Sequence, residues 1–297
     1  MTDLTGEAFL VLRSFFFDRQ GRSTRFVLRD KRNTQDDPFD ELIHSILSER
    51  LPGDCSCIKA PGPLITPDIV VLRPEPCRTV SRGSLANDLE RILAMEVKKL
   101  ERTGRGDIAR SSGLDYNTTP PCGTVRIYDH ADKPVDIRGF YLFVCQETVP
   151  GPERTYVVSA LAFCDGNLLN EDFDYYLSVV GARKKAIGIG SYGDGADRER
   201  PMLIFANPLG VPLLDRAATL IHLRSDLTTG MPNLKRIGVI RRTTKTKEGR
   251  KFYCYRVVGD APSEATEFDV ADPFPTPERQ EGTQPRGRFR LGISVPD

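Results

Sequence analysis

Two segments near the start of the chain carry the apolar spacing of amphipathic helices. In residues 7–18 and 37–50, apolar side chains recur every three to four positions, which places them along one side of a helix. Asp36 or Asp37 is a suitable N-cap for the second helix, and Pro38 fits its first turn. We therefore predict two helices before the first strand of the chain.

Most of the remaining pattern predicts β-strands. Short runs of β-branched and apolar residues are bounded by polar or Gly- and Pro-rich stretches, which is typical of strands. These runs are 69–72, 92–100, 124–129, 139–147, 155–164, 202–206, 219–223, 236–243 and 251–258. The last two flank a polar turn at 247–249 and predict a hairpin, whereas 168–186 has helical spacing. Pro, Gly and Cys residues in 52–66 predict a loop, and 81–92 is expected to be partly helical or a long turn.

This order of elements predicts an α/β fold in which helices flank a mixed central β-sheet. A length of 297 residues allows one sizeable core, and we expect a single domain over residues 1–260. Residues 261–297 are rich in Pro, Glu and Thr, so they predict an extended or partly disordered arm that buries little surface.

The composition is that of an ordinary soluble globular protein, with 39% hydrophobic and 28% charged residues. No apolar run approaches the roughly 18 to 20 residues that a membrane span requires. The first residues, MTDLTGEAFL, lack the basic start and the small-residue cleavage site of a secretory signal. We therefore expect a cytoplasmic protein without a membrane partner.

Several classes of catalytic site do not fit the sequence. The histidines His44, His130 and His222 lie far apart without metal-ligand spacing, which argues against a histidine–zinc site and a Ser–His–Asp triad. The seven cysteines form no CxxC pair, so they are expected to be free thiols, several of them buried. The glycines of 188–195 lack the Lys-Ser/Thr of a phosphate-binding P-loop and predict a turn.

Positive charge is concentrated in one segment. The formal net charge is +1, yet residues 235–251 hold eight basic residues and one acid. Such a stretch fits contacts with nucleic-acid phosphates, and a solvated hairpin has the same pattern. The candidate phosphate contacts in the hairpin are Arg241, Arg242, Lys245 and Lys247.

A pair of acids and a lysine fall on the two first predicted strands. Asp68 follows Pro67 at the start of 69–72, and Glu96 precedes Lys98 by two residues, so the last two share a face of their strand. Two carboxylates on neighbouring strands suit Mg²⁺, which prefers oxygen ligands. Lys98 is the only lysine with an acid two positions before it. A solvated surface ion pair is the alternative interpretation.

These residues resemble the signature of the PD-(D/E)XK nuclease superfamily. The segments TPDIVVL (66–72) and MEVKKLE (95–101) are similar to type II restriction endonucleases, including a group that contains GGCC cutters. The polar Asn117-Thr118-Thr119 before Pro120, and Asn33-Thr34-Gln35 before a helix, extend the similarity over roughly residues 30–125. The resemblance implies a restriction-endonuclease-like fold.

The resemblance also implies roles for individual residues. Asp68 and Glu96 would hold Mg²⁺, and Lys98 would place the attacking water and offset negative charge. Glu41, on the helix beside the sheet, would complete the metal site, although an amphipathic helix also shows such a residue on its solvated side. Further DNA contacts would come from Lys99, Arg102, Arg105, Arg110, Asn117, Thr118 and Thr119. A solvated basic loop followed by a hydrogen-bonded turn is the alternative for these residues.

The sequence thus predicts a Mg²⁺-dependent, sequence-specific endonuclease that cuts double-stranded DNA as a homodimer and leaves 5′-phosphate ends. A cognate DNA methyltransferase is expected in the same system, though not as a stable subunit. Two alternatives remain open at this point. One is a structure-specific or repair nuclease with the same chemistry, and the other is a DNA-binding protein without catalysis.

Overall fold

The computed structural model describes twelve stretches of the chain. These are residues 2–33, 36–62, 65–102, 108–109, 122–151, 154–171, 188–191, 197–200, 216–241, 249–263, 266–269 and 287–297. The helices are α1 (Leu4–Phe16), α2 (Pro38–Arg50), α3 (Pro74–Cys77), α4 (Arg82–Leu85) and α6 (Leu227–Gly230), with the 3₁₀ turn η3 (Val258–Asp260).

The strands of the first half include the two that carry the predicted acids. They are β1 (Arg25–Val27), β2 (Ser56–Lys59), β3 (Ile65–Thr66), β4 (Ile69–Leu72), β5 (Ile92–Arg102), β6 (Ile108–Ala109), β7 (Thr124–Tyr128) and β8 (Pro134–Thr148). The strands of the second half are β9 (Thr155–Asp165), β10 (Gly188–Ser191), β11 (Asp197–Arg200), β12 (Ala218–His222), β13 (Leu234–Arg241), β14 (Lys251–Val257), β15 (Thr266–Asp269) and β16 (Gly287–Arg288).

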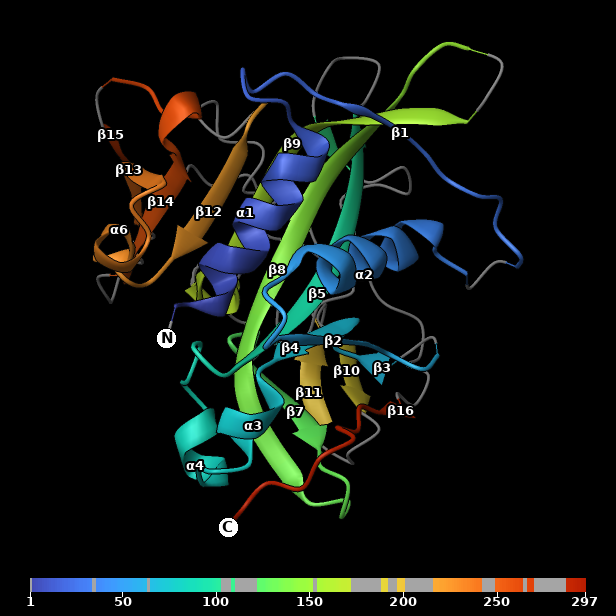
Figure 1. Ribbon diagram of the computed structural model, residues 1–297, viewed down its shortest axis with the longest axis vertical. Helices are drawn as coiled ribbons and strands as arrows, with labels where there is room; N and C mark the ends of the chain where they lie inside the picture. The colour runs from blue at the N-terminus through green and yellow to red at the C-terminus, as the bar shows by residue number, and fades with distance from the viewer. Residues whose placement is uncertain are drawn as a thin grey trace.

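One mixed sheet dominates the described part of the molecule, as Figure 1 shows. Nine strands follow one another in the order β15-β13-β14-β12-β9-β8-β5-β4-β2, while β1, β6 and β7 pair at its sides. β5 runs parallel to β8, and β4 runs antiparallel to both β5 and β2. The predicted α/β class with a mixed sheet flanked by helices is therefore confirmed. The predicted hairpin of β13 and β14 is confirmed as well.

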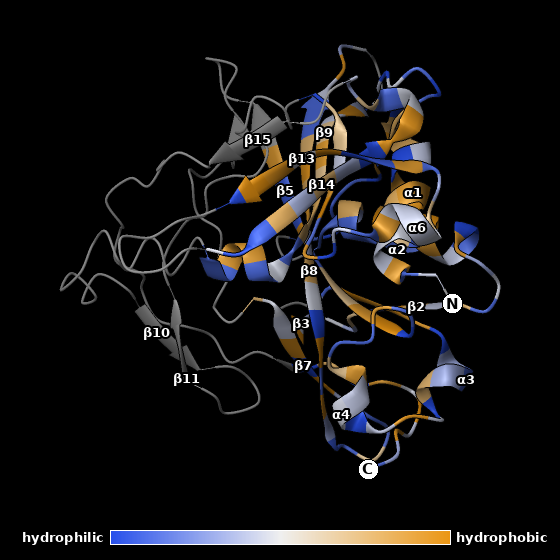
Figure 2. Cartoon of the chain, turned by 90° about the vertical axis from the view of Figure 1, so that its left-hand side faces the viewer, coloured by the Kyte–Doolittle hydropathy of each residue, from blue (hydrophilic) through white to orange (hydrophobic). Residues whose placement is uncertain are grey.

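Helices α1 and α2 lie together on one side of this sheet (Figure 2). Asp37 caps α2 by accepting a hydrogen bond from the Phe39 N–H, and Pro38 occupies its first turn, as the sequence predicts. The buried stripe of α2 includes Ile43 and Leu47, which pack with residues of α1 and the sheet into one hydrophobic cluster. This packing fixes the first turn of α2 beside the start of β4, where Asp40 and Asp68 line one cavity.

The segment predicted as a loop at 52–66 contains two short strands instead. β2 pairs with β4 along its whole length, from Ser56↔Leu72 to Lys59↔Ile69. The Pro and Gly residues flank β2 rather than interrupt it, and the pairing partner outweighs the loop-like composition. β2 consequently forms the edge of the sheet next to β4.

The end of the chain also differs from the prediction. Residues 287–297 were expected to bury little, yet Phe289, Leu291 and Val295 are buried against the lower part of the sheet. Arg82 holds the end of the chain through the Val295 carbonyl and the Asp297 carboxylate. Apolar residues alternate along this segment, so they face the core while their neighbours stay in solvent. The low average hydrophobicity of the region conceals this pattern.

Packing of the last residues predicts a measurable contribution to stability. Phe289→Ala removes a side chain that is 1% exposed, so the free energy of unfolding should fall by about 3 kcal/mol or more. Arg290→Ala is the matched control, because its side chain is 56% exposed and the change should cost at most about 0.5 kcal/mol. Urea denaturation of both variants measures the difference. Equal stability of the two variants would indicate that residues 287–297 are a loosely held arm.

Candidate active site

The site forms where β4 and β5 separate. Their antiparallel pairing ends at Ile69↔Met95, immediately before Asp68 on one strand and Glu96 on the other. The Asp68 carboxylate accepts a hydrogen bond of 2.7 Å from the Val97 N–H. This N–H belongs to the part of β5 that lies beyond its last residue pair with β4. This bond holds the side chain of Asp68 against β5.

Glu96 and Lys98 lie next to each other on β5, as the sequence predicts. The Lys98 Nζ is 2.8 Å from the Glu96 Oε1, and the Glu96 side chain is only 9% exposed. The other carboxylate oxygen, Oε2, is buried and has no hydrogen-bond partner among the described residues. A buried acceptor without a partner is costly, so this oxygen is suited to an incoming cation or donor.

Asp40 in the first turn of α2 belongs to the same group. Burial, followed by the negative charges of Asp68 and Asp37, raises the pKa of the Asp40 carboxyl to about 8. Glu96 raises this pKa further, while Lys98 lowers it. The charges of Asp68, Glu96 and Lys98 therefore all act on Asp40, and Asp40 and Asp68 line one cavity.

Sequence reasoning selected the neighbouring residue of α2. Glu41 lies beside Arg29, whose guanidinium is 2.5 Å from the Glu41 Oε2 and also pairs with Asp36. The Arg29 contact holds the pKa of Asp36 well below its usual range. Consecutive helical residues point about 100° apart, which separates the surroundings of Asp40 and Glu41.

A signal for Asp40 was present in the sequence. Asp40, Ile43 and Leu47 are spaced i, i+3 and i+7, so the half-buried acid continues the apolar stripe of α2. An acid in line with a buried stripe is less solvated than an acid on the exposed side of the helix. We therefore consider Asp40, in place of Glu41, as the helix residue of the site.

A cavity of about 310 Å³ opens beside the carboxylates. Its walls come from the loop before α2, the first turn of α2, the end of β2, the β2–β3 connection and the start of β4. They comprise Arg32, Asn33, Asp36, Asp37, Asp40, Lys59, Ala60, Pro61, Gly62, Ile65 and Asp68. Asp36 is engaged by Arg29, and Asp37 both caps α2 and lies 3.8 Å from the Lys99 Nζ. Asp40 and Asp68 thus face the cavity together with the cationic side chains of Arg32 and Lys59.

The predicted DNA-contacting residues are only partly described. Lys99 points to the helix side of β5, opposite to Lys98, and contacts the N-cap Asp37. Arg241 lies at the end of β13, and the backbone of Arg102 ends β5. The others, Arg105, Arg110, Asn117, Thr118, Thr119, Arg242, Lys245 and Lys247, lie outside the described residues.

The donor set fits Mg²⁺ as a loosely held ion rather than a caged one. Among the described residues, no group of three or more His, Cys, Asp and Glu side chains is arranged as a ready-made metal site. Mg²⁺ keeps several waters and is often bound through one or two carboxylates, so a complete protein cage is not required. Asp68 and Glu96 supply such oxygens, and the unpartnered Oε2 of Glu96 is one of them.

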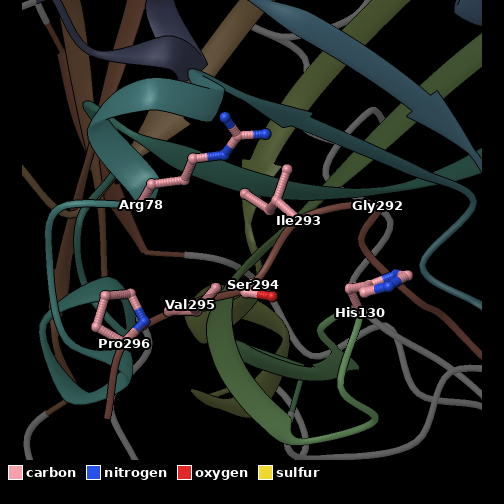
Figure 3. A pocket seen from close by; sticks show the side chains of 7 residues that line it. All are labelled: Arg78, His130, Gly292, Ile293, Ser294, Val295 and Pro296. Carbon is pink, nitrogen blue, oxygen red and sulfur yellow. The ribbon is translucent and has the colours of Figure 1, made fainter.

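Other polar groups of the described chain are separate from this site. All seven cysteines are free, as predicted, and burial raises the pKa of the Cys254 thiol to about 12. His44 Nε2 lies 3.2 Å from the Cys57 carbonyl oxygen. His130 and Arg78 contribute the ionisable side chains of a cavity of about 560 Å³ along the last residues of the chain (Figure 3).

Comparison of the chain with protein-family models, with curated proteins and with solved structures finds no match. No helix in the described ranges has the length and apolar character needed to cross a bilayer. Inferences about function therefore depend on the residues of this chain and on their geometry.

The electrostatics of the cluster predict a pH-dependent effect of Asp40→Asn. The folded-state pKa of about 8 lies above the ordinary value of 3.8, so ionisation of Asp40 disfavours the folded state. In EDTA, Asp40→Asn should match wild type near pH 4, gain in relative melting temperature as the pH rises, and reach a constant difference above about pH 8. The neutral amide avoids the repulsion that the carboxylate meets.

Glu41→Gln is the matched control, because it removes the adjacent carboxylate of the same helix, which lies beside Arg29. Its difference in melting temperature from wild type should stay constant between pH 5 and 9. A constant difference for Asp40→Asn as well would contradict the proximity of Asp40 to the other carboxylates.

Proposed function

We propose that this protein is a Mg²⁺-dependent, sequence-specific endonuclease that hydrolyses double-stranded DNA. The observation that carries the proposal is the position of Asp68, whose carboxylate is held by the Val97 N–H between Glu96 and Lys98, which form an ion pair of 2.8 Å. Two neighbouring acids, one with an unpartnered oxygen, suit a cation, and phosphodiester hydrolysis is a reaction that uses a cation at such a position.

The arrangement of Lys98 supports a hydrolytic reaction. Its ammonium is held by the Glu96 carboxylate, just beyond the end of the β4–β5 pairing. From there Lys98 would orient the attacking water and offset the negative charge that develops on the phosphate. Mg²⁺ held by Asp68 and Glu96 would add positive charge beside the same phosphate.

The helix residue supports the resemblance to PD-(D/E)XK nucleases. That resemblance implies an acid on the helix packed against the active-site sheet, in addition to two acids and a lysine on neighbouring strands. Asp40 supplies this acid, since its carboxyl interacts with both Asp68 and Glu96. A type II restriction endonuclease that acts as a homodimer on a twofold DNA site is the specific form that we propose.

A plasmid digest distinguishes this function from its alternatives. With purified full-length protein and Mg²⁺, we expect discrete fragments with 5′-phosphate ends and no cleavage in EDTA. Nicks confined to branched DNA would indicate a structure-specific nuclease, and a mobility shift without cleavage would indicate a DNA-binding protein. Intact plasmid without a mobility shift would contradict all three functions.

Lys98→Ala should lower the cleavage rate by at least about 10²-fold, while specific DNA binding persists in Ca²⁺. The lysine serves the reaction more than the complex, so the loss should appear in the rate rather than in affinity. Lys133→Ala is the control, because Lys133 is a half-exposed lysine that pairs with Asp297 and does not line the cavity beside the carboxylates. Cleavage by Lys98→Ala within tenfold of the control would refute the role of Lys98.

The cavity beside the carboxylates predicts a further phosphate contact. Lys59 lines this cavity with Asp40 and Asp68, and no salt bridge joins it to an acid of the described chain. Lys59→Gln should therefore weaken DNA binding. The slope of log K against log salt concentration should become less steep by about 0.9, the value for one phosphate contact.

Lys31→Gln is the control for this measurement, because Lys31 is exposed close to Arg32 without lining the cavity. Binding is measured by fluorescence anisotropy in Ca²⁺ at several salt concentrations. Identical salt slopes for both variants would show that Lys59 does not contact the DNA backbone.

A further inference from the structure

A second polar cavity, of about 460 Å³, lies at the start of β5. It is formed by the N-terminus of α1, the connection from α4 to β5, the start of β8 and the end of β12. Its walls include Asp3, Arg91, Arg138, His222 and Arg224. None of these residues lines the acidic cavity described above. The two cavities are therefore separate sites.

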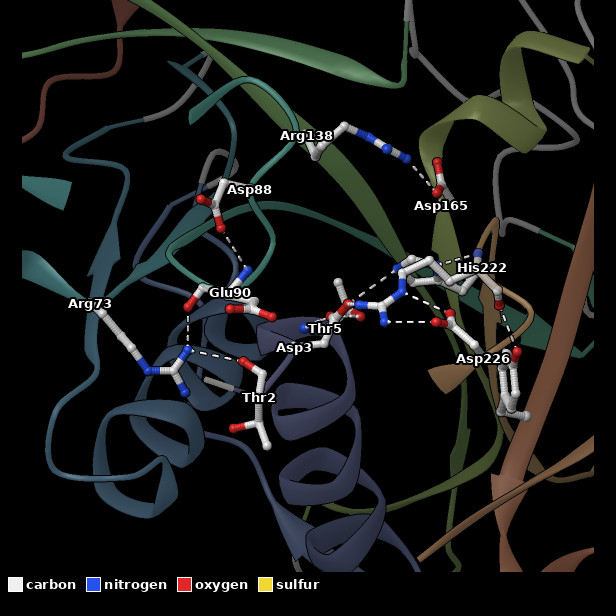
Figure 4. Close-up of polar contacts among 12 residues, drawn as sticks. Thr2, Asp3, Thr5, Arg73, Asp88, Glu90, Arg138, Asp165, His222 and Asp226 are labelled. Carbon is white, nitrogen blue, oxygen red and sulfur yellow. Dashed lines mark hydrogen bonds and ion pairs between the residues drawn. The ribbon is translucent and has the colours of Figure 1, made fainter. Parts of the chain in front are cut away.

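Ion pairs already engage the charged side chains of this wall (Figure 4). Arg138 donates to the fully buried Asp165, and Arg224 donates to both Asp226 and Asp3. Asp3 also accepts a hydrogen bond from the Thr5 N–H as the N-cap of α1. The acids of the network thus have donors, and their charges are balanced by arginines.

His222 presents an unused donor. Its side chain is 1% exposed, and its Nδ1 accepts a hydrogen bond of 2.9 Å from the Arg224 N–H. Nδ1 therefore carries no proton, and burial lowers the pKa of the imidazole, which is consequently neutral with its proton on Nε2. The nearest carboxylate oxygen, on Asp3, is 3.8 Å from Nε2, which is too long for a hydrogen bond.

Two arginines of the wall also have an N–H donor without an acceptor. The Nε atoms of Arg91 and Arg138 are buried and have no acceptor among the described residues, although other atoms of both guanidinium groups are paired. Six buried side-chain atoms of the described chain lack a partner, and three belong to residues of this cavity. All three are N–H donors, so the wall lacks acceptors and not donors.

We propose that this cavity binds a small molecule through an oxoanion group, a carboxylate or a phosphate. An oxoanion supplies several acceptor oxygens to N–H donors, and arginine forms its strongest hydrogen bonds with such groups. Because one water takes about 30 Å³ of liquid, 460 Å³ has room for an oxoanion together with an organic group. Asp3, Asp88 and Glu90 also line the cavity, so a singly charged ligand fits better than a highly charged one.

Isothermal titration of the full-length protein in EDTA tests this site, with sodium phosphate and sodium acetate as probes and sodium chloride at equal ionic strength as the blank. We expect saturable binding of at least one probe. Phosphate alone would identify a phosphate ester as the ligand class, and acetate alone would identify a carboxylate. EDTA removes divalent cations from the carboxylate cluster, so the result is independent of nuclease activity.

Arg138→Lys keeps a cation for Asp165 and removes the Nε donor, so affinity for the probe should fall at least tenfold. Arg126→Lys is the matched control on the exposed pair with Asp136 and should bind as wild type does.

In wild type the ring ¹⁵N resonances of His222 should move on titration. The His222→Phe variant identifies these resonances and should also weaken binding. Absence of saturable binding, or unchanged affinity in both Arg138→Lys and His222→Phe, would overturn the proposal and leave a cavity that holds water only.

Discussion

The structure of the candidate active site depends on holding like charges together where two strands part. Carboxylates of α2, β4 and β5 repel one another, and the scaffold opposes this repulsion with a few specific contacts. The Val97 N–H fixes Asp68, and Lys98 neutralises one oxygen of Glu96. No hydrogen bond from the described residues holds Asp40 in this way, so burial and the charges of Asp68 and Asp37 raise the pKa of its carboxyl to about 8.

This arrangement is supported by the packing of α2 rather than by the polar groups themselves. The apolar stripe of α2, with Phe39 and Ile43, is buried against α1 and the sheet, and Asp37 satisfies a free N–H of its first turn. Burial of such side chains contributes roughly 1.5–3 kcal/mol each, which is enough to offset an unfavourable group at the helix start.

Local patterns of the sequence were sufficient for β4 and β5 and for the order of the chemical groups on them. β4, β5 and the Asp68–Glu96–Lys98 set follow from short-range alternation, which persists in the folded chain. The choice of Asp40 over Glu41 depends on which side of α2 meets the sheet, and this is set by contacts with residues far along the chain. The strand at Ser56–Lys59 likewise depends on its partner β4, and burial of Phe289 depends on a surface formed by other elements.

The two polar cavities differ in what their walls lack, and this difference gives each a distinct chemistry. At the carboxylate cluster the unpartnered atom is an acceptor, Glu96 Oε2, so that site favours a cation. At the start of β5 the unpartnered atoms are donors, including His222 Nε2, so that site favours an anion. Both sites contact β5, one before its first residue at Arg91 and the other around Glu96 and Lys98.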